Sequence, residues 1–162
     1  MSDEDRYFED LPVGIVLEHR YGRTITTADN IWFSLLTQNQ AAIHIDHHHA
    51  AATRFGKPLV NSTLTLSIVT GQSTLDLSHN VFANLGWDEV TLPNPVFEGD
   101  TLYSHTEILS ARESRSNPKV GIVTVRTTGM NQDGVVVITF KRTVMLYRRG
   151  HAPQTRPQQR SD

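Results

Sequence analysis

The sequence predicts an α+β fold in which one largely buried helix precedes an antiparallel sheet. The run 62–75 carries apolar residues around much of a helical circumference, as expected of a helix that is buried on most sides. Residues 121–128 and 135–147 alternate apolar and polar side chains as half-buried strands do, and the tetrapeptide 131–134, Asn-Gln-Asp-Gly, predicts a hairpin between them. A sheet wrapped around the helix would cover its apolar surface, so we expect that arrangement.

The length of the chain bounds its organisation. With 162 residues it is long enough for one domain with a core of its own. The tail 149–162 is rich in Gln, Arg and Pro and is expected to be disordered, which leaves residues 1–148 as a single domain.

Composition excludes several classes of function. The chain has no cysteine, so disulfides, thiol nucleophiles and cysteine zinc sites are ruled out. The net charge of −2 is not concentrated in any block, which argues against a nucleic-acid groove. The start of the chain is acidic and no apolar run approaches about 18 residues, which argues against a secretory leader and a membrane helix. We therefore expect a cytoplasmic protein.

A strand and a helix are expected before residue 40. Residues 15–26 are rich in β-branched and aromatic side chains and predict an irregular strand. Thr26 and Asp29 have the spacing of a capping box, so a helix should begin there and end near Thr37. The apolar residues of this helix share one face: Ile31, Trp32, Leu35 and Leu36.

Two further helices should follow a polar loop. Asp46 is placed to cap a short helix over 47–54. Asn61 or Ser62 then caps the central helix, which should end between residues 71 and 74. The capping residues therefore define the start of the central helix to within one position.

From residue 80 onward, strand patterns replace helical ones. The short piece 90–92 is bounded by Pro93 and Pro95, which restrict it to a sheet edge or a turn. Residues 101–111 alternate imperfectly and predict a strand, and the charged loop 112–119 separates it from the next one.

Residues suited to chemistry gather between positions 39 and 49, just before the central helix. Asn39 and His44 lie five residues apart, and the exposed N–H groups at the start of the following helix can hold an anion. A histidine titrates near neutrality, which suits proton transfer. His44 is also compatible with a hydrogen-bonded core histidine, and Asn39 with an asparagine that satisfies loop backbone groups. On the residues alone, both interpretations stay open.

The acidic residue and the other histidines of this stretch allow further interpretations. Asp46 is close enough in sequence to His44 to be a general acid, but the helix after it needs an N-cap, which favours capping. His44 and His48 have the i, i+4 spacing of some zinc sites. Because Asp46 marks a helix start, His44 would lie outside that helix, and three consecutive histidines point in different directions. We therefore expect no metal site.

Several motifs, in order, resemble the MaoC-like hydratase/dehydratase family of the hot-dog superfamily. They are Phe-Gly-Lys-Pro and the run after it over 55–71, Pro-Val-Phe-Glu-Gly-Asp-Thr-Leu at 95–102, and the hairpin tetrapeptide at 131–134. The shared layout extends over residues 8–148. The stretch 80–90 further resembles one branch of that family, the mesaconyl-CoA (itaconyl-CoA, β-methylmalyl-CoA) hydratases.

The resemblance implies a fold and a site. The fold would be the hot-dog fold, a long central helix wrapped by a curved antiparallel β-sheet, and two subunits would pair through their sheets with the active site at their interface. The family carries a catalytic loop of the form Asp-x-Asn-Pro-x-His. His44 matches its histidine, whereas Asn39 stands at the position of its aspartate. Ser62 stands where a backbone N–H, usually that of a glycine, holds the thioester oxygen.

The resemblance also implies a reaction, the reversible addition of water to a short enoyl-CoA. The branch suggests a branched, carboxylate-bearing acyl group such as that of mesaconyl-CoA. His44 would transfer the proton, Asn39 would position the water, and the Ser62 amide would polarise the thioester. Asn61, Arg115 and Lys119 are candidates for binding the substrate or the CoA phosphates, although a solvated loop is the simpler interpretation of the two basic residues. No cofactor is expected, because the CoA thioester is the substrate, and the assembly should be a homodimer or a multiple of it.

Two alternative functions remain. The first is a hot-dog acyl-CoA thioesterase, but these enzymes usually carry a carboxylate on the central helix, and residues 62–75 contain none. The second is a non-catalytic CoA-binding or partner subunit. It rests on Asn39, whose amide cannot take up a proton as an aspartate can.

Overall fold

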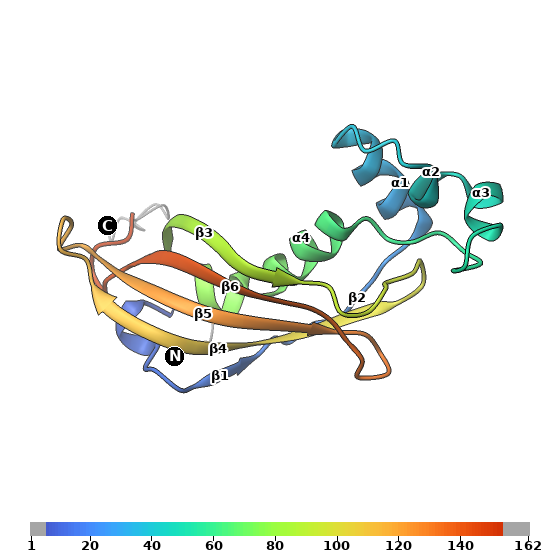
Figure 1. Cartoon of the computed structure of the whole chain (residues 1–162). Helices are drawn as coiled ribbons and strands as arrows, with labels where there is room; N and C mark the ends of the chain where they lie inside the picture. Colours follow the sequence, from blue (N-terminus) through green and yellow to red (C-terminus); the bar gives the residue numbers. More distant parts are fainter. Residues whose placement is uncertain (1–5, 154–162) are drawn as a thin grey trace, which may run out of the picture.

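The structure, a computed structural model, describes residues 6–153 and contains a curved antiparallel sheet with one helix across its face and three beyond its end (Figure 1). The helical elements are η2 (Phe8–Asp10), α1 (Thr27–Leu36), α2 (Ala42–Ile45), α3 (His47–Ala51), α4 (Ser62–Gln72) and η3 (Thr74–Ser78). The strands are β1 (Val16–Glu18), β2 (Arg23–Thr24), β3 (Val81–Thr91), β4 (Thr101–Glu113), β5 (Val120–Met130) and β6 (Val136–Tyr147). No helix in the described range combines the length and apolar character needed to span a bilayer.

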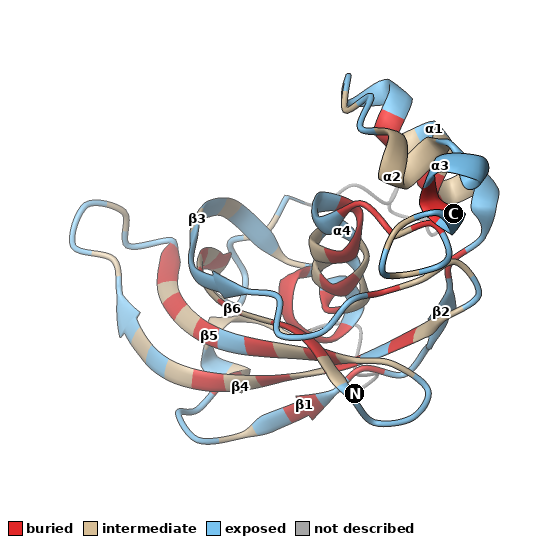
Figure 2. Cartoon of the chain, turned by 45° about the vertical axis from the view of Figure 1, so that its right-hand side comes forward, coloured by how far each residue is buried: buried red, intermediate tan, exposed pale blue. Residues whose placement is uncertain are grey.

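The sheet has the strand order β1-β4-β5-β6-β3, and β2 pairs separately with β4. All of these pairs are antiparallel. Buried residues alternate along β4, β5 and β6, and α4 lies across their buried face (Figure 2). The predicted α+β arrangement, a central helix covered by an antiparallel sheet, is confirmed.

The central helix α4 rests closely on β5. A Cβ atom placed on Gly129 would lie 2.8 Å from a methyl carbon of Val69 on α4 and 2.8 Å from one of Ile138 on β6. A glycine at this position therefore lets the helix approach the sheet. α4 ends at Gln72, within the expected range, and the short turn η3 continues the chain toward β3.

The helix starts indicated by the sequence are present. Thr26 and Asp29 form a capping box at α1. Asp46 caps α3, which is shorter than expected and ends at Ala51. Asn61 caps α4, so Ser62 is the first residue of the helix.

Two expectations about strands were wrong in extent. The irregular strand expected over 15–26 is two short strands, β1 and β2, separated by residues 19–22. Residues 90 and 91 of the piece expected at 90–92 are the end of a much longer edge strand, β3, which begins at Val81. Most residues of β3 are exposed on both faces, so the alternation that marks a half-buried strand is missing from its sequence.

α1 turns its apolar face to solvent within a single chain. Trp32 is 76% exposed and Leu36 is 78% exposed, whereas Asn30 and Ser34 are fully buried. The polar side of this helix therefore packs inward, toward the segment that leads into α4.

Most of the expected tail, residues 154–162, lies outside the described range. At its beginning, the side chain of Arg149 donates two hydrogen bonds to the Asp10 carboxylate.

Candidate active site

His44 lies on α2, beyond the end of the sheet, with its imidazole half-buried. Its Nδ1 is 2.9 Å from the backbone oxygen of Leu59. Because a carbonyl oxygen can only accept a hydrogen bond, Nδ1 carries the proton and Nε2 carries the lone pair. In the neutral form of the ring, this contact leaves Nε2 as the nitrogen that can accept a proton.

The start of α4 provides a backbone donor. The Asn61 side chain accepts a hydrogen bond from the N–H of Thr63 at 3.0 Å, and its carbonyl accepts one from the N–H of Thr65 at 3.1 Å. In the described part of the chain, no hydrogen bond uses the N–H of Ser62. Ser62 is exposed at the positive end of an 11-residue helix, so its N–H is available to an anionic or polarised oxygen.

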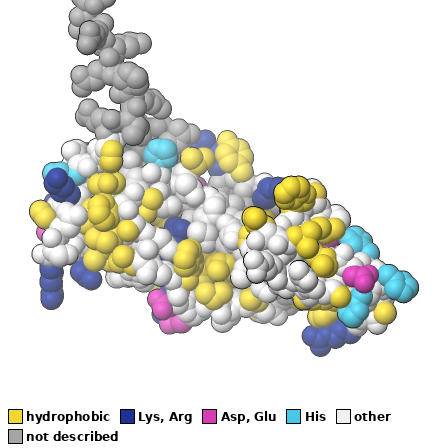
Figure 3. Space-filling view, turned by 90° about the horizontal axis from the view of Figure 1, so that it is seen from above, with side chains coloured by type: hydrophobic (Ala, Val, Ile, Leu, Met, Phe, Trp, Pro, Cys, Tyr) yellow, Lys and Arg dark blue, Asp and Glu magenta, His cyan; other side chains and the backbone are white. Residues whose placement is uncertain are grey.

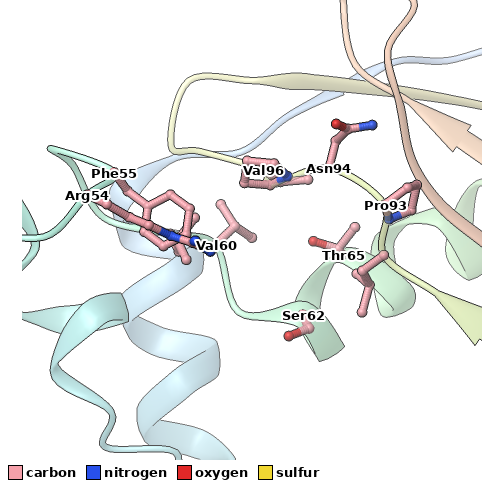
Figure 4. Close-up of a pocket in the computed structure, with 11 residues that line it drawn as sticks. Arg54, Phe55, Val60, Ser62, Thr65, Pro93, Asn94 and Val96 are labelled. Carbon is pink, nitrogen blue, oxygen red and sulfur yellow. The ribbon is translucent and has the colours of Figure 1, made fainter.

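A pocket of about 280 Å³ opens at this helix start (Figure 4). Ser62 and Thr65 of α4 line it from one side, and Pro93 and Asn94 line it from the segment after β3. Leu59, whose carbonyl holds His44, also lines the pocket. His44 itself is not a lining residue, so its connection to the pocket at Ser62 runs through Leu59.

A buried amide that the sequence interpretation missed joins these two parts. Asn30 of α1 is fully buried, and its Nδ2 lies 3.0 Å from the backbone oxygens of both His44 and Leu59. Its Oδ1 accepts the N–H of Asn61 at 2.9 Å. Nothing in the sequence marks this asparagine, because a polar residue inside a helix is ordinarily expected to face solvent.

Asn39 turns its side chain back onto its own loop. Its Oδ1 accepts the N–H of Ala41 at 3.2 Å, as in an asparagine that satisfies local backbone groups. Its own N–H donates to the backbone oxygen of Ser34 at 2.8 Å. Among the described contacts there is no hydrogen bond between Asn39 and His44, so a role for Asn39 in positioning water stays a prediction.

Asp46 serves the local structure as the cap of α3. The Asp46 carboxylate accepts the N–H of His49 at 2.9 Å, and this hydrogen bond lowers the pKa of Asp46 below its usual range. The capping interpretation of Asp46 is thus confirmed. His47 Nε2 lies 3.6 Å from a carboxylate oxygen of Glu98. Residues 6–153 contain no group of three or more His, Cys, Asp or Glu side chains arranged to hold a metal ion.

The other predicted binding residues do not converge on this pocket within one chain. Asn61 is buried, and its Nδ2 donates to the Ser34 hydroxyl while its Oδ1 serves the cap. Arg115 and Lys119 lie in the loop after β4, at the opposite end of the sheet from α2 (Figure 1). The strand between has 13 residues, a span of about 40 Å. Their contact with substrate or CoA stays a prediction.

Comparison with known proteins places the chain in a family. Residues 10–131 match the family described as MaoC like domain. The chain is 33% identical to a mesaconyl-CoA hydratase of Cereibacter sphaeroides, over 93% of this chain and 44% of that protein. It is 31% identical to a beta-methylmalyl-CoA dehydratase of Chloroflexus aurantiacus, over 95% of this chain and 44% of that protein. It thus spans less than half the length of these two relatives.

A shorter relative and a solved structure complete the comparison. The chain is 28% identical to an (R)-specific enoyl-CoA hydratase of Aeromonas caviae, over 80% of this chain and 90% of that protein. A structure from Mycobacterium tuberculosis described as a double hotdog fold is similar with a TM-score of 0.82 and 27% identity, over 97% of this chain and 48% of that one. The fold is therefore a hot-dog fold, and the chain belongs to the MaoC-like family.

Proposed function

We propose that this protein is a hydro-lyase that adds water reversibly to the α,β double bond of an enoyl-CoA. The observation that carries the proposal is that Leu59, whose carbonyl holds His44 Nδ1, lines the same pocket as Ser62, whose N–H at the start of α4 is unused. Relatives named mesaconyl-CoA hydratase, beta-methylmalyl-CoA dehydratase and (R)-specific enoyl-CoA hydratase support the same class of reaction.

In the proposed reaction, His44 Nε2 takes a proton from water while the water oxygen forms a bond to Cβ of the enoyl group. The electrons of the double bond move toward the thioester, whose oxygen becomes enolate-like. The Ser62 N–H and the α4 dipole stabilise that charge, a contribution of about 3 kcal/mol for one well-placed donor. The imidazolium then returns the proton to Cα, and the neutral imidazole is restored.

The finer proposal is a short, branched or carboxylated acyl group such as mesaconyl-CoA. It is supported by the names of the two relatives with which the chain shares 31–33% identity. Asn39 is compatible with such a substrate, because a neutral amide does not repel a second carboxylate as an aspartate would.

We further propose a homodimer or a multiple of it. The edge strand β3 leaves Phe82, Leu85 and Trp87 exposed, and apolar patches are spread over the face seen from above (Figure 3). An exposed apolar strand edge favours pairing with another chain. The structure described as a double hotdog fold, of which this chain covers 48%, supports an arrangement of two such units.

The alternatives differ in what each predicts. The thioesterase interpretation is disfavoured because α4, from Ser62 to Gln72, carries no carboxylate. The partner-subunit interpretation is favoured by Asn39, which cannot act as a general acid or base.

The test is to mix the protein with mesaconyl-CoA and with crotonyl-CoA and follow both enoyl-thioester absorbance and free thiol. A hydratase bleaches the absorbance and releases no thiol, a thioesterase releases thiol, and an inert partner subunit does neither. In a hydratase, His44→Ala should lower kcat by about 10²–10⁴-fold while the protein stays folded. Undiminished activity of that variant on every ester would contradict the assignment of His44.

A further inference from the structure

The base and the oxyanion donor come from different helices that are separated by a long irregular segment. His44 is on α2 and Ser62 begins α4, with α3 and a loop between them. A misplacement of about 1 Å between such groups can cost about 100-fold in rate. Their separation therefore has to be fixed by something other than the intervening chain.

We propose that Asn30 is a positioning residue that sets His44 and the Ser62 N–H at a fixed separation and selects the tautomer of His44. The proposal rests on the function proposed above for His44 and Ser62. Asn30 is fully buried on α1, the helix before both of them, and touches backbone groups at each end of the intervening segment.

On the side of the base, Asn30 and His44 share one acceptor. The Leu59 oxygen is 3.0 Å from Asn30 Nδ2 and 2.9 Å from His44 Nδ1, so these two nitrogens lie at most 5.9 Å apart. The amide nitrogen also lies 3.0 Å from the backbone oxygen of His44 itself. Asn30 thereby holds the His44 backbone and orients the carbonyl that receives the imidazole proton. The contact with the Leu59 oxygen is the one that bears on the tautomer, because that carbonyl accepts the proton of His44 Nδ1 and leaves the lone pair at Nε2.

Toward the oxyanion donor, the same side chain accepts a hydrogen bond instead of donating one. Asn30 Oδ1 accepts the N–H of Asn61 at 2.9 Å. Asn61 is the cap of α4 and immediately precedes Ser62, so this bond fixes the position of the first helical N–H. The planar amide of Asn30 thus connects the backbone around His44 with the start of α4.

The requirement for an amide follows from its chemistry. Its nitrogen carries two hydrogens and lies within hydrogen-bond distance of three acceptors, the backbone oxygens of His44 and Leu59 at 3.0 Å and Oε1 of Glu98 at 3.1 Å. Its oxygen accepts a backbone N–H. An aspartate at this position would keep only the acceptor, and a leucine would keep neither. Asn30→Asp would therefore remove the contacts on the side of His44 and keep the one at the start of α4, whereas Asn30→Leu would remove both.

The experiment compares Asn30→Asp and Asn30→Leu with a matched control, Ser34→Ala. Ser34 lies one turn later on α1, is equally buried, and accepts a hydrogen bond from Asn61 Nδ2 at 3.2 Å without touching Leu59 or His44. For each folded protein, long-range ¹H–¹⁵N spectra report the tautomer of His44, and steady-state kinetics separate kcat from KM.

We expect wild type and Ser34→Ala to hold the Nδ1–H tautomer. Asn30→Leu should give a mixture of tautomers and a kcat lowered about 10- to 100-fold, with KM changed less than about threefold. Asn30→Asp should lose the single tautomer as well, because it lacks both N–H donors. If the wild type hydrates nothing, the proposed function fails, whereas the tautomer comparison still decides the role of Asn30. An Asn30→Asp protein with an unchanged tautomer, or equal losses of kcat in the Asn30 variants and Ser34→Ala, would overturn the proposal.

Discussion

A buried histidine far from the candidate site makes a sharp prediction about stability and pH. His19 Nδ1 lies 3.0 Å from the Asp76 carboxylate, and its Nε2 lies 2.8 Å from the Thr106 hydroxyl. Thr106 is in turn 2.9 Å from the Thr127 hydroxyl. The His19 side chain is completely buried, so this chain of polar groups lies inside the sheet.

Burial lowers the pKa of His19 and outweighs the opposing effect of the Asp76 carboxylate. The ring is therefore harder to protonate in the folded protein than in the unfolded chain, where a histidine titrates near 6.5. As pH falls, the unfolded chain takes up a proton that His19 in the folded protein does not. The contribution of His19 to the free energy of unfolding is therefore fully present above pH 6.5 and decreases below it. One proton contributes at most about 1.4 kcal/mol per pH unit, which limits the loss between pH 6.5 and pH 5 to about 2 kcal/mol.

The assay is urea unfolding of wild type and His19→Asn at half-unit steps from pH 5 to pH 8. The variant is expected to be less stable throughout, because it disrupts a buried network. Its stability should nevertheless fall less steeply below pH 6.5, while the two curves run parallel above pH 7. Parallel curves down to pH 5 would refute the claim that burial of His19 controls this part of the pH dependence.

Three further substitutions test the site, the core and the assembly. Asn39→Asp should lower kcat/KM for mesaconyl-CoA more than for crotonyl-CoA, because it adds a negative charge where a second carboxylate would bind; equal effects in steady-state assays would argue against a dicarboxylic substrate. Gly129→Ala should lower the free energy of unfolding by about 1–3 kcal/mol, measured by urea titration, because its methyl group would press on Val69 and Ile138. Trp87→Lys, on the exposed edge strand, should raise the dissociation constant of the proposed dimer at least about tenfold by sedimentation, and an unchanged constant would exclude β3 from the interface.

The parts of the fold that the sequence predicts well are those determined by local chemistry. Thr26, Asp46 and Asn61 each bond to N–H groups two or three residues away, so their roles as caps are visible in a short stretch of sequence. The strands β5 and β6 are covered on one face by α4, and their alternation shows it. β3 is covered on neither face within one chain, so its sequence lacks the alternation that would have marked Val81–Thr91 as one long strand.

α1 shows why hydrophobic patterns can identify a helix and still leave its orientation open. Its apolar face carries Trp32 and Leu36, which are exposed, while Asn30 and Ser34 are buried. Periodicity shows that one side differs from the other, but it does not distinguish a side that faces the core from one suited to a partner.

In the candidate site, too, some residues could be predicted from local chemistry and others could not. His44 could be singled out because an imidazole has few chemical equivalents, and Ser62 because a helix start exposes N–H groups wherever it occurs. The groups proposed to set their geometry are a backbone carbonyl, that of Leu59, and a buried amide, that of Asn30. A carbonyl is present in every residue, and an asparagine inside a helix looks like any other polar surface residue. A sequence can thus indicate the reactive groups, whereas the contacts that fix their separation are formed between distant segments and are seen only in the folded structure.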